Sequence, residues 1–216
     1  MMYDSIKRII DLVGSVFLIV LFSPIMLVTA VIIKITAPGP ALVESGNSHM
    51  RRIGKDGKIF RLFKFRSMPV YSDSILTSNP KFRKLYYEWK KSNFKLHQDP
   101  RVTKFGKFIR KFSIDEMPQL FNVLRGDMSL VGPRPYHALE LKEQQKVYPG
   151  TAKFVRETQT VKPGITGYWQ VSGRSDINFD RRIEMDADYA KRKSLLMDIF
   201  IIAKTPFVMV SGKGAV

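Results

Sequence analysis

The stretch "LVGSVFLIVLFSPIMLVTAVII" (residues 12–33) decides the architecture of this chain, because 22 successive residues carry no charge. At about 1.5 Å of rise per residue, a helix of this length reaches across the apolar core of a bilayer. Ser23 and Pro24 stand at its midpoint, where the proline removes one helix hydrogen bond and presses on the preceding turn. The sequence therefore predicts a segment in lipid at the start of the chain, with a kink at its centre.

Basic residues flank this segment on both sides: Lys7 and Arg8 precede it, and Lys34 follows it. Positive residues favour the cytoplasmic side of a membrane, and a straight spanning helix cannot place both flanks there. A helix broken at Ser23 and Pro24 dips into one leaflet and returns, and the Ser23 hydroxyl is expected to bind a carbonyl that the proline leaves unpaired. Because spanning helices also tolerate proline, charge and length leave dipping and spanning equally open.

Composition limits what the rest of the chain does. A chain of 216 residues forms one compact domain with appendages. Its 36 Lys and Arg against 19 Asp and Glu, a formal net charge of +17, predict lipid headgroups, nucleic acid or a phosphorylated substrate as partner. The absence of cysteine excludes disulfides and thiol catalysis. The Pro and Gly residues of "APGPA" (37–41) predict a boundary between residues 1–36 and residues 37–216.

A basic hairpin is expected directly after this boundary. The stretch "RRIGKDGKIFRLFKFRSM" (51–68) places an Asp-Gly pair between two short apolar runs, which is a hairpin signal. Alternation in the second strand puts Phe63 and Phe65 on one face and Lys64 and Arg66 on the other. Taken alone, the basic face is better explained by exposure to solvent.

Two further segments have the spacing of amphipathic or apolar helices. "RVTKFGKFIRKF" (101–112) repeats apolar residues at helical intervals with Lys and Arg between them. "SLLMDIFIIAKTPFVMV" (194–210) is mostly apolar and is interrupted by Pro206. Either helix can pack on the core or lie in the lipid interface, and the sequence does not separate these alternatives.

The stretch "SIDEMPQL" (113–120) sets two carboxylates side by side in a basic chain. Apolar spacing predicts a short helix that ends at Gly126, and Pro118 belongs in its first turn. This places Asp115 and Glu116 at the positive end of the helix, where Asp115 should stay ionised. Ser113 and Glu116 form the alternative of a capping box, although Pro118 then falls one turn too deep.

The chemistry of these acids has a simple and a functional interpretation. In the simple one, Asp115 only caps the helix. In the functional one, an ionised and partly desolvated Asp115 beside free backbone donors and Arg110 attacks a phosphorus atom and forms an acyl phosphate. The motif "GPRP" (132–135) holds Arg134 between two prolines. Such an arginine suits bidentate phosphate binding or is merely an exposed turn residue.

Four motifs carry a resemblance to a known family. "KFRSM" (64–68), "SIDEMPQLFNVLRGDMSLVGPRP" (113–135), "KPGITGYWQVSGR" (162–174) and "SGKGAV" (211–216), in this order, resemble the bacterial sugar transferase family. Its members are monotopic phosphoglycosyl transferases that begin cell-surface glycan synthesis. The likeness covers nearly the whole chain from Ile6 onward and looks like the minimal catalytic form. The stretch "ALVESGNSHMRR" (41–52) departs from the family, where an aromatic pair is common.

The resemblance implies a two-step transfer of a sugar phosphate from a UDP-sugar to undecaprenyl phosphate, with Mg²⁺. Asp115 matches the nucleophile that takes the phosphosugar as UMP leaves. Glu116 would position or deprotonate the incoming phosphate, and both acids would hold the metal. The positions implied to bind substrate are Lys64, Arg66, Arg110, Arg134, Gln170 and Arg174.

The resemblance also implies the fold, place and partners of the chain. The fold would be α/β, a small mixed core wrapped by amphipathic interfacial helices, with a re-entrant segment over residues 1–36 and a cytoplasmic, membrane-associated catalytic domain over residues 37–216. Ser23 and Pro24 match its re-entrant hairpin, and with Lys7 and Arg8, which the flanking charge indicates, they are the expected membrane residues, at the cytoplasmic face of the bacterial inner membrane. "GYWQVSGR" (167–174) is closer to the hexose-transferring branch, which points to UDP-galactose or UDP-glucose.

The expected partners are therefore the UDP-sugar, undecaprenyl phosphate, inner-membrane lipids and downstream glycosyltransferases, with no nucleic acid. A rival of another class is a membrane-tethered basic protein that binds nucleic acid or anionic lipid without turnover. That rival requires neither the paired acids nor the "GPRP" motif.

Overall fold

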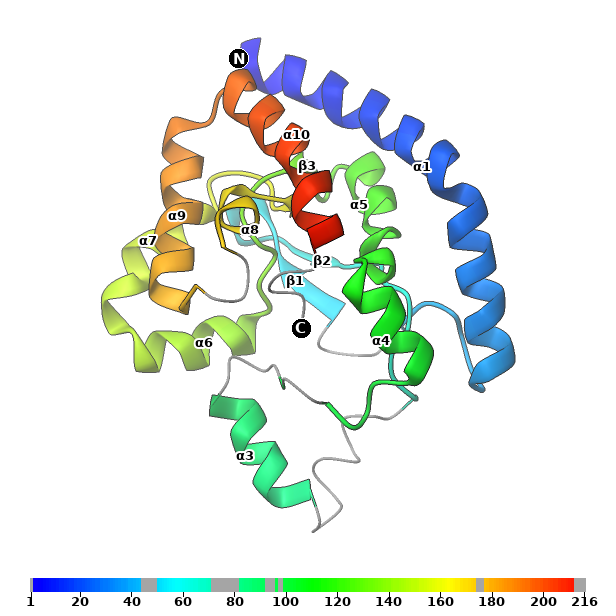
Figure 1. Cartoon of the computed structure of the whole chain (residues 1–216). Coiled ribbons are helices and arrows are strands. Elements are labelled where there is room, and N and C mark those ends of the chain that lie inside the picture. The colour runs from blue at the N-terminus through cyan, green and yellow to red at the C-terminus, as the bar shows by residue number, and fades with distance from the viewer. Residues whose placement is uncertain are drawn as a thin grey trace.

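The structure is a computed structural model that describes residues 2–43, 50–70, 82–91, 96, 99–173 and 177–211. Figure 1 shows mostly helices around two small sheets. The α-helices are α1 (Met2–Thr36), α3 (Arg83–Lys91), α4 (Lys104–Lys111), α5 (Gln119–Arg125), α6 (Ala138–Val147), α7 (Ala152–Thr158), α8 (Tyr168–Ser172), α9 (Phe179–Arg192) and α10 (Leu195–Ser211). The strands are β1 (Arg51–Ile53), β2 (Ile59–Arg61), β3 (Ser129–Val131) and β4 (Gly164–Thr166). The expected small mixed α/β core is confirmed.

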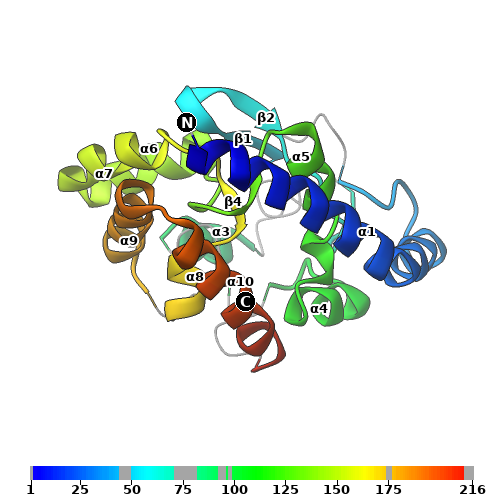
Figure 2. The ribbon, with the colours of Figure 1, turned by 90° about the horizontal axis from the view of Figure 1, so that it is seen from above.

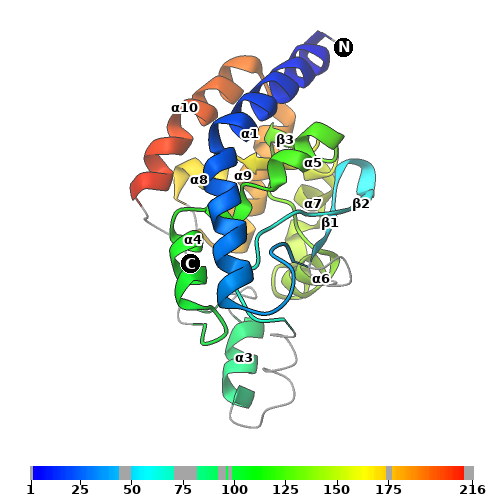
Figure 3. The ribbon, with the colours of Figure 1, turned by 90° about the vertical axis from the view of Figure 1, so that its right-hand side faces the viewer.

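Helix α1 carries the uncharged segment and runs for 35 residues with Pro24 inside it. By length and composition it is the one helix in the described part of the chain able to cross a membrane. The helix changes direction along its length without being interrupted (Figures 1 and 3). Ser23 Oγ donates to Val20 O at 2.8 Å, the carbonyl that Pro24 cannot pair with because it has no N–H. The expected role of the Ser23 hydroxyl is confirmed, while α1 bends rather than breaks.

Both ends of α1 contact the same domain. Near its start, Arg8 donates from Nη1 to Val123 O at 2.6 Å and from Nη2 to Leu124 O at 2.8 Å, at the end of α5. Near its end, buried Ile33 packs in an apolar cluster with Phe65 and Ile109. Figure 2 shows the helix lying across the domain from α5 toward α4. The domain therefore holds α1 along its length.

The predicted hairpin is present, but its second strand is shorter than expected. Strands β1 and β2 pair antiparallel, with Arg52 opposite Phe60. The turn between them has left-handed backbone angles at Asp56 (φ 56°) and Gly57 (φ 73°), as an Asp-Gly turn requires. Strand β2 ends at Arg61, so residues 63–66 lie beyond it and the expected alternation of faces is wrong there.

The second sheet joins two of the sequence motifs. Strands β3 and β4 pair parallel, and beyond them Gly132 N donates to Thr166 O and Gly164 N donates to Pro133 O, both at 2.9 Å. A Cβ on Gly164 would lie 2.0 Å from Gly132 N. Only glycine permits this approach, which explains Gly132 in "VGPRP" and Gly164 in "KPGITG".

The core lies between these sheets and the helices around them. The largest apolar cluster draws residues from β2, α5, β3, α8, α9 and α10, and is centred on fully buried Val123, Met128 and Ile201. A second cluster joins α6, α7 and α9 around Phe179 and Ile183. Burial of these side chains fixes the ends of β3 and β4, and therefore the loops that follow them.

Two predicted helices present apolar residues to solvent. In α4, Ile109 is fully buried, but Phe108 is 52% exposed and Phe112 is 38% exposed. In α10, the most exposed apolar residues are Leu196 and Phe207, at 82% and 77%. The helices are confirmed, and each combines a core face with an unpaired apolar face.

Candidate active site

The two acids lie in one turn of 3-10 helix, η4 (Ile114–Glu116), between α4 and α5. Ser113 before it has a left-handed backbone (φ 56°, ψ 22°) and makes no capping hydrogen bond with its side chain. Pro118, not Asp115, occupies the N-cap position of α5, which ends at left-handed Gly126 as predicted. The capping box does not form, and Asp115 is not a helix cap.

Lys64 joins the two carboxylates. Its Nζ lies 2.8 Å from Asp115 Oδ2 and 3.4 Å from Glu116 Oε1. Asp115 is 2% exposed, and its backbone carbonyl accepts from Phe65 N at 2.9 Å. The segment after β2 is thus tied directly to the turn that carries the acids.

Asn122 on α5 fixes the same segment from the other side. Its Oδ1 accepts from Phe63 N at 2.9 Å, and its Nδ2 donates to Arg61 O at 2.7 Å. The side chain is fully buried. Sequence reasoning missed Asn122, although a polar residue within the apolar spacing of a predicted helix was a usable signal.

Burial dominates the electrostatics of Asp115 and raises the pKa of its carboxyl. The charge of Lys64 opposes this shift, Glu116 adds to it, and Arg110 at the end of α4 lowers the pKa again. Because the N–H groups of Glu116 and Met117 donate to carbonyls within the turn, the free backbone donors expected there are already engaged. The basic side chains, rather than a helix start, favour the ionised form of Asp115.

Two arginines face Glu116 from other parts of the chain. The negative charge of Glu116 acts on both Arg52 of β1 and Arg134 of the "GPRP" loop. Burial lowers the pKa of Arg52 to about 10. Burial also lowers the pKa of Arg134, but the charges of Glu140, Glu116 and Asp186 and the Tyr136 side chain together outweigh it and the pKa is raised. Glu140 lies 3.9 Å from Arg134 Nε and 4.0 Å from Arg52 Nη1.

A third arginine lies against the aromatic wall of this site. The guanidinium of Arg182 on α9, 2% exposed, lies 5.2 Å from the ring centre of Trp169 and 5.5 Å from that of Tyr136. One turn later, Asp186 Oδ2 accepts from Arg134 N at 3.1 Å. Complete burial raises the pKa of Asp186 to about 7.

Many buried polar atoms of this cluster have no hydrogen-bond partner among the described residues. They are Arg52 Nε and Nη1, Arg134 Nε, Tyr136 Oη, Trp169 Nε1, Arg182 Nε and Nη2, and Asp186 Oδ1. A buried polar group without a hydrogen-bond partner destabilises a protein by about 1–3 kcal/mol. A polar ligand that hydrogen-bonds to these atoms would therefore stabilise the cluster. Unused guanidinium donors suit phosphate.

Comparison with known proteins agrees with this chemistry. The profile described as bacterial sugar transferase matches residues 2–212. The chain is 43% identical to the undecaprenyl-phosphate galactose phosphotransferase of Salmonella typhimurium, over 97% of this chain and 41% of the relative. It is 38% identical to the exopolysaccharide production protein ExoY of Rhizobium meliloti, over 95% and 86%.

The chain belongs to the bacterial sugar transferase family.

A third relative is named for a different sugar. The UDP-N-acetylgalactosamine-undecaprenyl-phosphate N-acetylgalactosaminephosphotransferase of Aeromonas hydrophila is 40% identical, over 99% of this chain and 45% of the relative. The chain thus spans less than half the length of the Salmonella and Aeromonas relatives.

Two residues that the resemblance implied as substrate ligands donate hydrogen bonds to backbone carbonyls, and a third lies outside the described residues. Arg66 is buried, and donates to Pro38 O at 2.6 Å and Ala37 O at 2.8 Å, at the end of α1. Gln170 donates to Ile165 O at 3.2 Å. Arg174 lies outside the described residues. Their roles in substrate binding stay predictions.

Proposed function

We propose that this sugar transferase moves a sugar 1-phosphate from a UDP-sugar to undecaprenyl phosphate through a covalent intermediate on Asp115. The observation that carries the proposal is a buried carboxylate 2.8 Å from Lys64 Nζ, beside arginines with unpaired donors. A capping or structural acid needs no such surroundings, whereas a nucleophile among phosphate-binding groups does.

In the first step, Asp115 Oδ forms a bond to the phosphorus that carries the sugar. The bond from that phosphorus to the bridging oxygen breaks, and UMP leaves with the electron pair. Lys64, Arg52 and Arg134 bear positive charge near the dyad, where they offset charge on the attacked phosphate and on UMP.

In the second step, an oxygen of undecaprenyl phosphate attacks the same phosphorus. The acyl phosphate bond breaks and returns Asp115 as a carboxylate. Glu116, less buried than Asp115, accepts the proton of a singly protonated acceptor phosphate or orients it. Each step is a displacement at phosphorus, so no oxidant or reductant is required.

Asp115 and Glu116 also suit the Mg²⁺ that the family resemblance implied. The described residues contain no group of three or more acidic or histidine side chains that would enclose a metal. Mg²⁺ is commonly held by one or two carboxylates together with substrate phosphates and water, and Lys64 shows that the two carboxylates reach a common point. When bound, the ion would neutralise phosphate charge.

The contacts of α1 support a monotopic position on the cytoplasmic face of the inner membrane. A helix crossing the bilayer would leave its two ends on opposite sides, but Arg8 and Ile33 both contact one domain. The exposed apolar residues of α1, α4 and α10 provide surface for insertion into one leaflet. In this position α1 is a bent re-entrant segment, and the active site lies near the headgroups of its lipid substrate.

A hexose is the proposed sugar, because "GYWQVSGR" resembles the hexose branch and the Salmonella relative is named for galactose. The chain is similarly identical to a relative named for N-acetylgalactosamine. The proposed reaction therefore does not depend on which sugar is transferred. The rival interpretation, a basic binder of nucleic acid or anionic lipid without turnover, gives no role to buried Asp115.

The test is UMP release and intermediate trapping by the full chain in detergent, with UDP-galactose, UDP-glucose and UDP-N-acetylgalactosamine. UDP-sugar alone should attach a sugar phosphate to the peptide that contains Asp115, detected by mass spectrometry. Asp115→Asn should abolish both the adduct and UMP release, whereas Asp180→Asn, at an exposed acid on α9, should change neither. UMP release by Asp115→Asn at the normal rate would place the nucleophile elsewhere.

A further inference from the structure

A cavity of about 170 Å³ lies at the N-terminal end of α1 and shares no lining residue with the candidate active site. Five basic side chains line it against two carboxylates. The basic residues are Lys7, Arg8, Lys55, Lys162 and Lys193. They come from α1, the β1–β2 turn, the loop before β4 and the residue that follows α9, so the folded chain alone brings them together.

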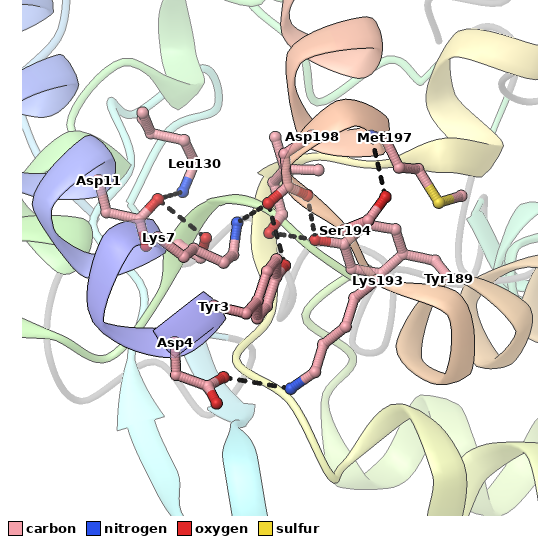
Figure 4. Close-up of polar contacts among 12 residues, drawn as sticks. Tyr3, Asp4, Lys7, Asp11, Leu130, Tyr189, Lys193, Ser194, Met197 and Asp198 are labelled. Atoms are coloured by element: carbon pink, nitrogen blue, oxygen red, sulfur yellow. Dashed lines mark hydrogen bonds and ion pairs between the residues drawn. The ribbon is translucent and has the colours of Figure 1, made fainter. Parts of the chain in front are cut away.

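The acids around this cavity are already engaged (Figure 4). Asp4 pairs with Lys193 at 3.2 Å. Asp198 pairs with Lys7 at 2.9 Å and accepts from the hydroxyls of two tyrosines. Asp11 Oδ1 accepts from the backbone of β3 at 2.9 Å and from the Ser129 hydroxyl at 3.0 Å.

Three of the cations have no carboxylate partner. Arg8 donates to backbone carbonyls at the end of α5, which satisfies its hydrogen bonds but adds no full negative charge. Lys55 and Lys162 have no ion pair or side-chain hydrogen bond within the described part of the chain. A Cβ on Gly126 would lie 3.5 Å from Lys162 Nζ and 3.6 Å from Arg8 Nη2, so these two positive groups flank the same glycine.

The surroundings of Lys162 disfavour the charged form of its ammonium group. Burial lowers the pKa of Lys162, and the charge of Arg8 lowers it further. Asp11 and Asp127 act in the opposite direction without restoring the ordinary value. The fold therefore holds an excess of positive charge in a concave, partly desolvated place, and a bound anion would offset that cost.

We propose that this cavity binds a phosphate group through Lys55 and Lys162, carried either by an anionic lipid headgroup or by a soluble phosphate ester. Phosphate oxygens accept from ammonium donors, and Arg8 and Lys193 add to the attractive field. The cavity lies where α1 begins, shortly before its uncharged residues, a position that a headgroup and a soluble ester both reach. This site is independent of transfer on Asp115.

The experiment measures acetylation of individual lysines by mass spectrometry in the full chain, reconstituted in phosphatidylcholine nanodiscs. One arm adds glycerol 3-phosphate, a second replaces part of the lipid by phosphatidylglycerol, and a third adds sodium chloride at matched ionic strength. Lys142, an exposed lysine on α6, is the internal reference. At ten times the dissociation constant, acetylation of Lys55 and Lys162 should fall about tenfold relative to Lys142.

The two sources of phosphate give different results. Protection by glycerol 3-phosphate identifies a soluble ester, and protection by phosphatidylglycerol alone identifies a lipid headgroup. Lys162→Gln should remove the protection of Lys55 in the effective arm, whereas Lys146→Gln, at another exposed lysine of α6, should retain it. Equal protection of Lys142, the same effect from sodium chloride, or no protection in either phosphate arm would overturn the proposal.

Discussion

Two clusters of buried polar residues in this protein differ in how completely they are hydrogen-bonded. Where α1 meets the domain, Asp198 accepts from Tyr189, Tyr3 and Lys7, and Asp11 accepts from a hydroxyl and a backbone N–H. In the cluster that extends from the acid dyad, polar atoms of three arginines and of Asp186 are buried without a hydrogen-bond partner within the described chain.

This difference in hydrogen bonding distinguishes a cluster that attaches α1 to the domain from a cluster in which a ligand can bind. A buried polar group that is fully paired stabilises one arrangement, whereas one left unpaired costs free energy until a ligand completes it. The α1 cluster therefore holds α1 against the domain, and we expect the dyad cluster to bind a polar ligand. Variants in the two clusters should separate folding from activity.

The largest effect is expected from Lys64→Met. Lys64 opposes the rise in the pKa of Asp115 that burial causes, so its removal raises that pKa further. Less Asp115 is then ionised at a given pH, and the rising limb of the pH–rate profile moves to higher pH. The rate of UMP release at pH 7 should fall by about 10²–10³-fold.

Lys64→Arg is the matched control for this prediction, because it keeps the positive charge. Its rising limb should lie nearer to that of the unmodified protein than the limb of Lys64→Met does. A rising limb that stays in place in Lys64→Met shows that Lys64 does not control the ionisation of Asp115.

A smaller effect is expected from Arg182→Met. Its Nε and Nη2 have no partner to lose within the described chain, and methionine keeps much of the packing against Trp169. The KM for UDP-sugar should rise about 10- to 100-fold, as for a lost hydrogen bond to a charged group, while the melting temperature changes little. Arg181→Met, at an exposed neighbour, should leave both unchanged, and a large loss of melting temperature in Arg182→Met would make this arginine structural.

The opposite pattern is expected from Asp11→Ala in the α1 cluster. This change leaves the Ser129 hydroxyl and Leu130 N–H buried without their acceptor and should lower the free energy of unfolding by about 1–3 kcal/mol. Asp11→Asn retains an acceptor and should lose less. The KM for UDP-sugar should stay the same in both variants, and a raised KM with unchanged stability would show that the two clusters are not separate in function.

Local patterns in the sequence predicted the parts of the molecule that local physics controls. The uncharged run predicted the apolar centre of α1, an Asp-Gly pair predicted the hairpin turn, and apolar spacing with Gly126 predicted α5 and its end. The dyad was found because adjacent acids are conspicuous in a basic chain. Each of these depends on neighbours within a few positions.

The rest of the site depends on contacts that no local pattern encodes. Arg52, Arg134 and Arg182 lie far apart in sequence, and the fold brings their segments together because Ile53 N of β1 donates to Tyr136 O and Arg134 N donates to Asp186 of α9. Arg66 shows the converse, since it shares a motif with Lys64 yet donates to the carbonyls at the end of α1. Residue type indicated phosphate binding, but only the fold decides which arginines face the acids.

The smallest effect is expected from removing a side-chain hydrogen bond inside α1. Ser23 Oγ donates to Val20 O, the carbonyl that loses its helix donor because Pro24 has no N–H. Ser23→Ala should therefore lower stability in detergent by about 0.5–1.5 kcal/mol. In a Pro24→Ala background the backbone N–H returns to Val20 O, so the same change should have almost no effect, and a double-mutant cycle of thermal unfolding measures this coupling. The double variant also restores a straight uncharged helix, so a Ser5→Cys label, in a chain without native cysteine, should become partly reactive from the periplasm only there. Equal costs of Ser23→Ala in both backgrounds would show that the hydroxyl does not replace the missing donor, and labelling of Ser5→Cys with Ser23 and Pro24 intact would exclude the re-entrant position of α1.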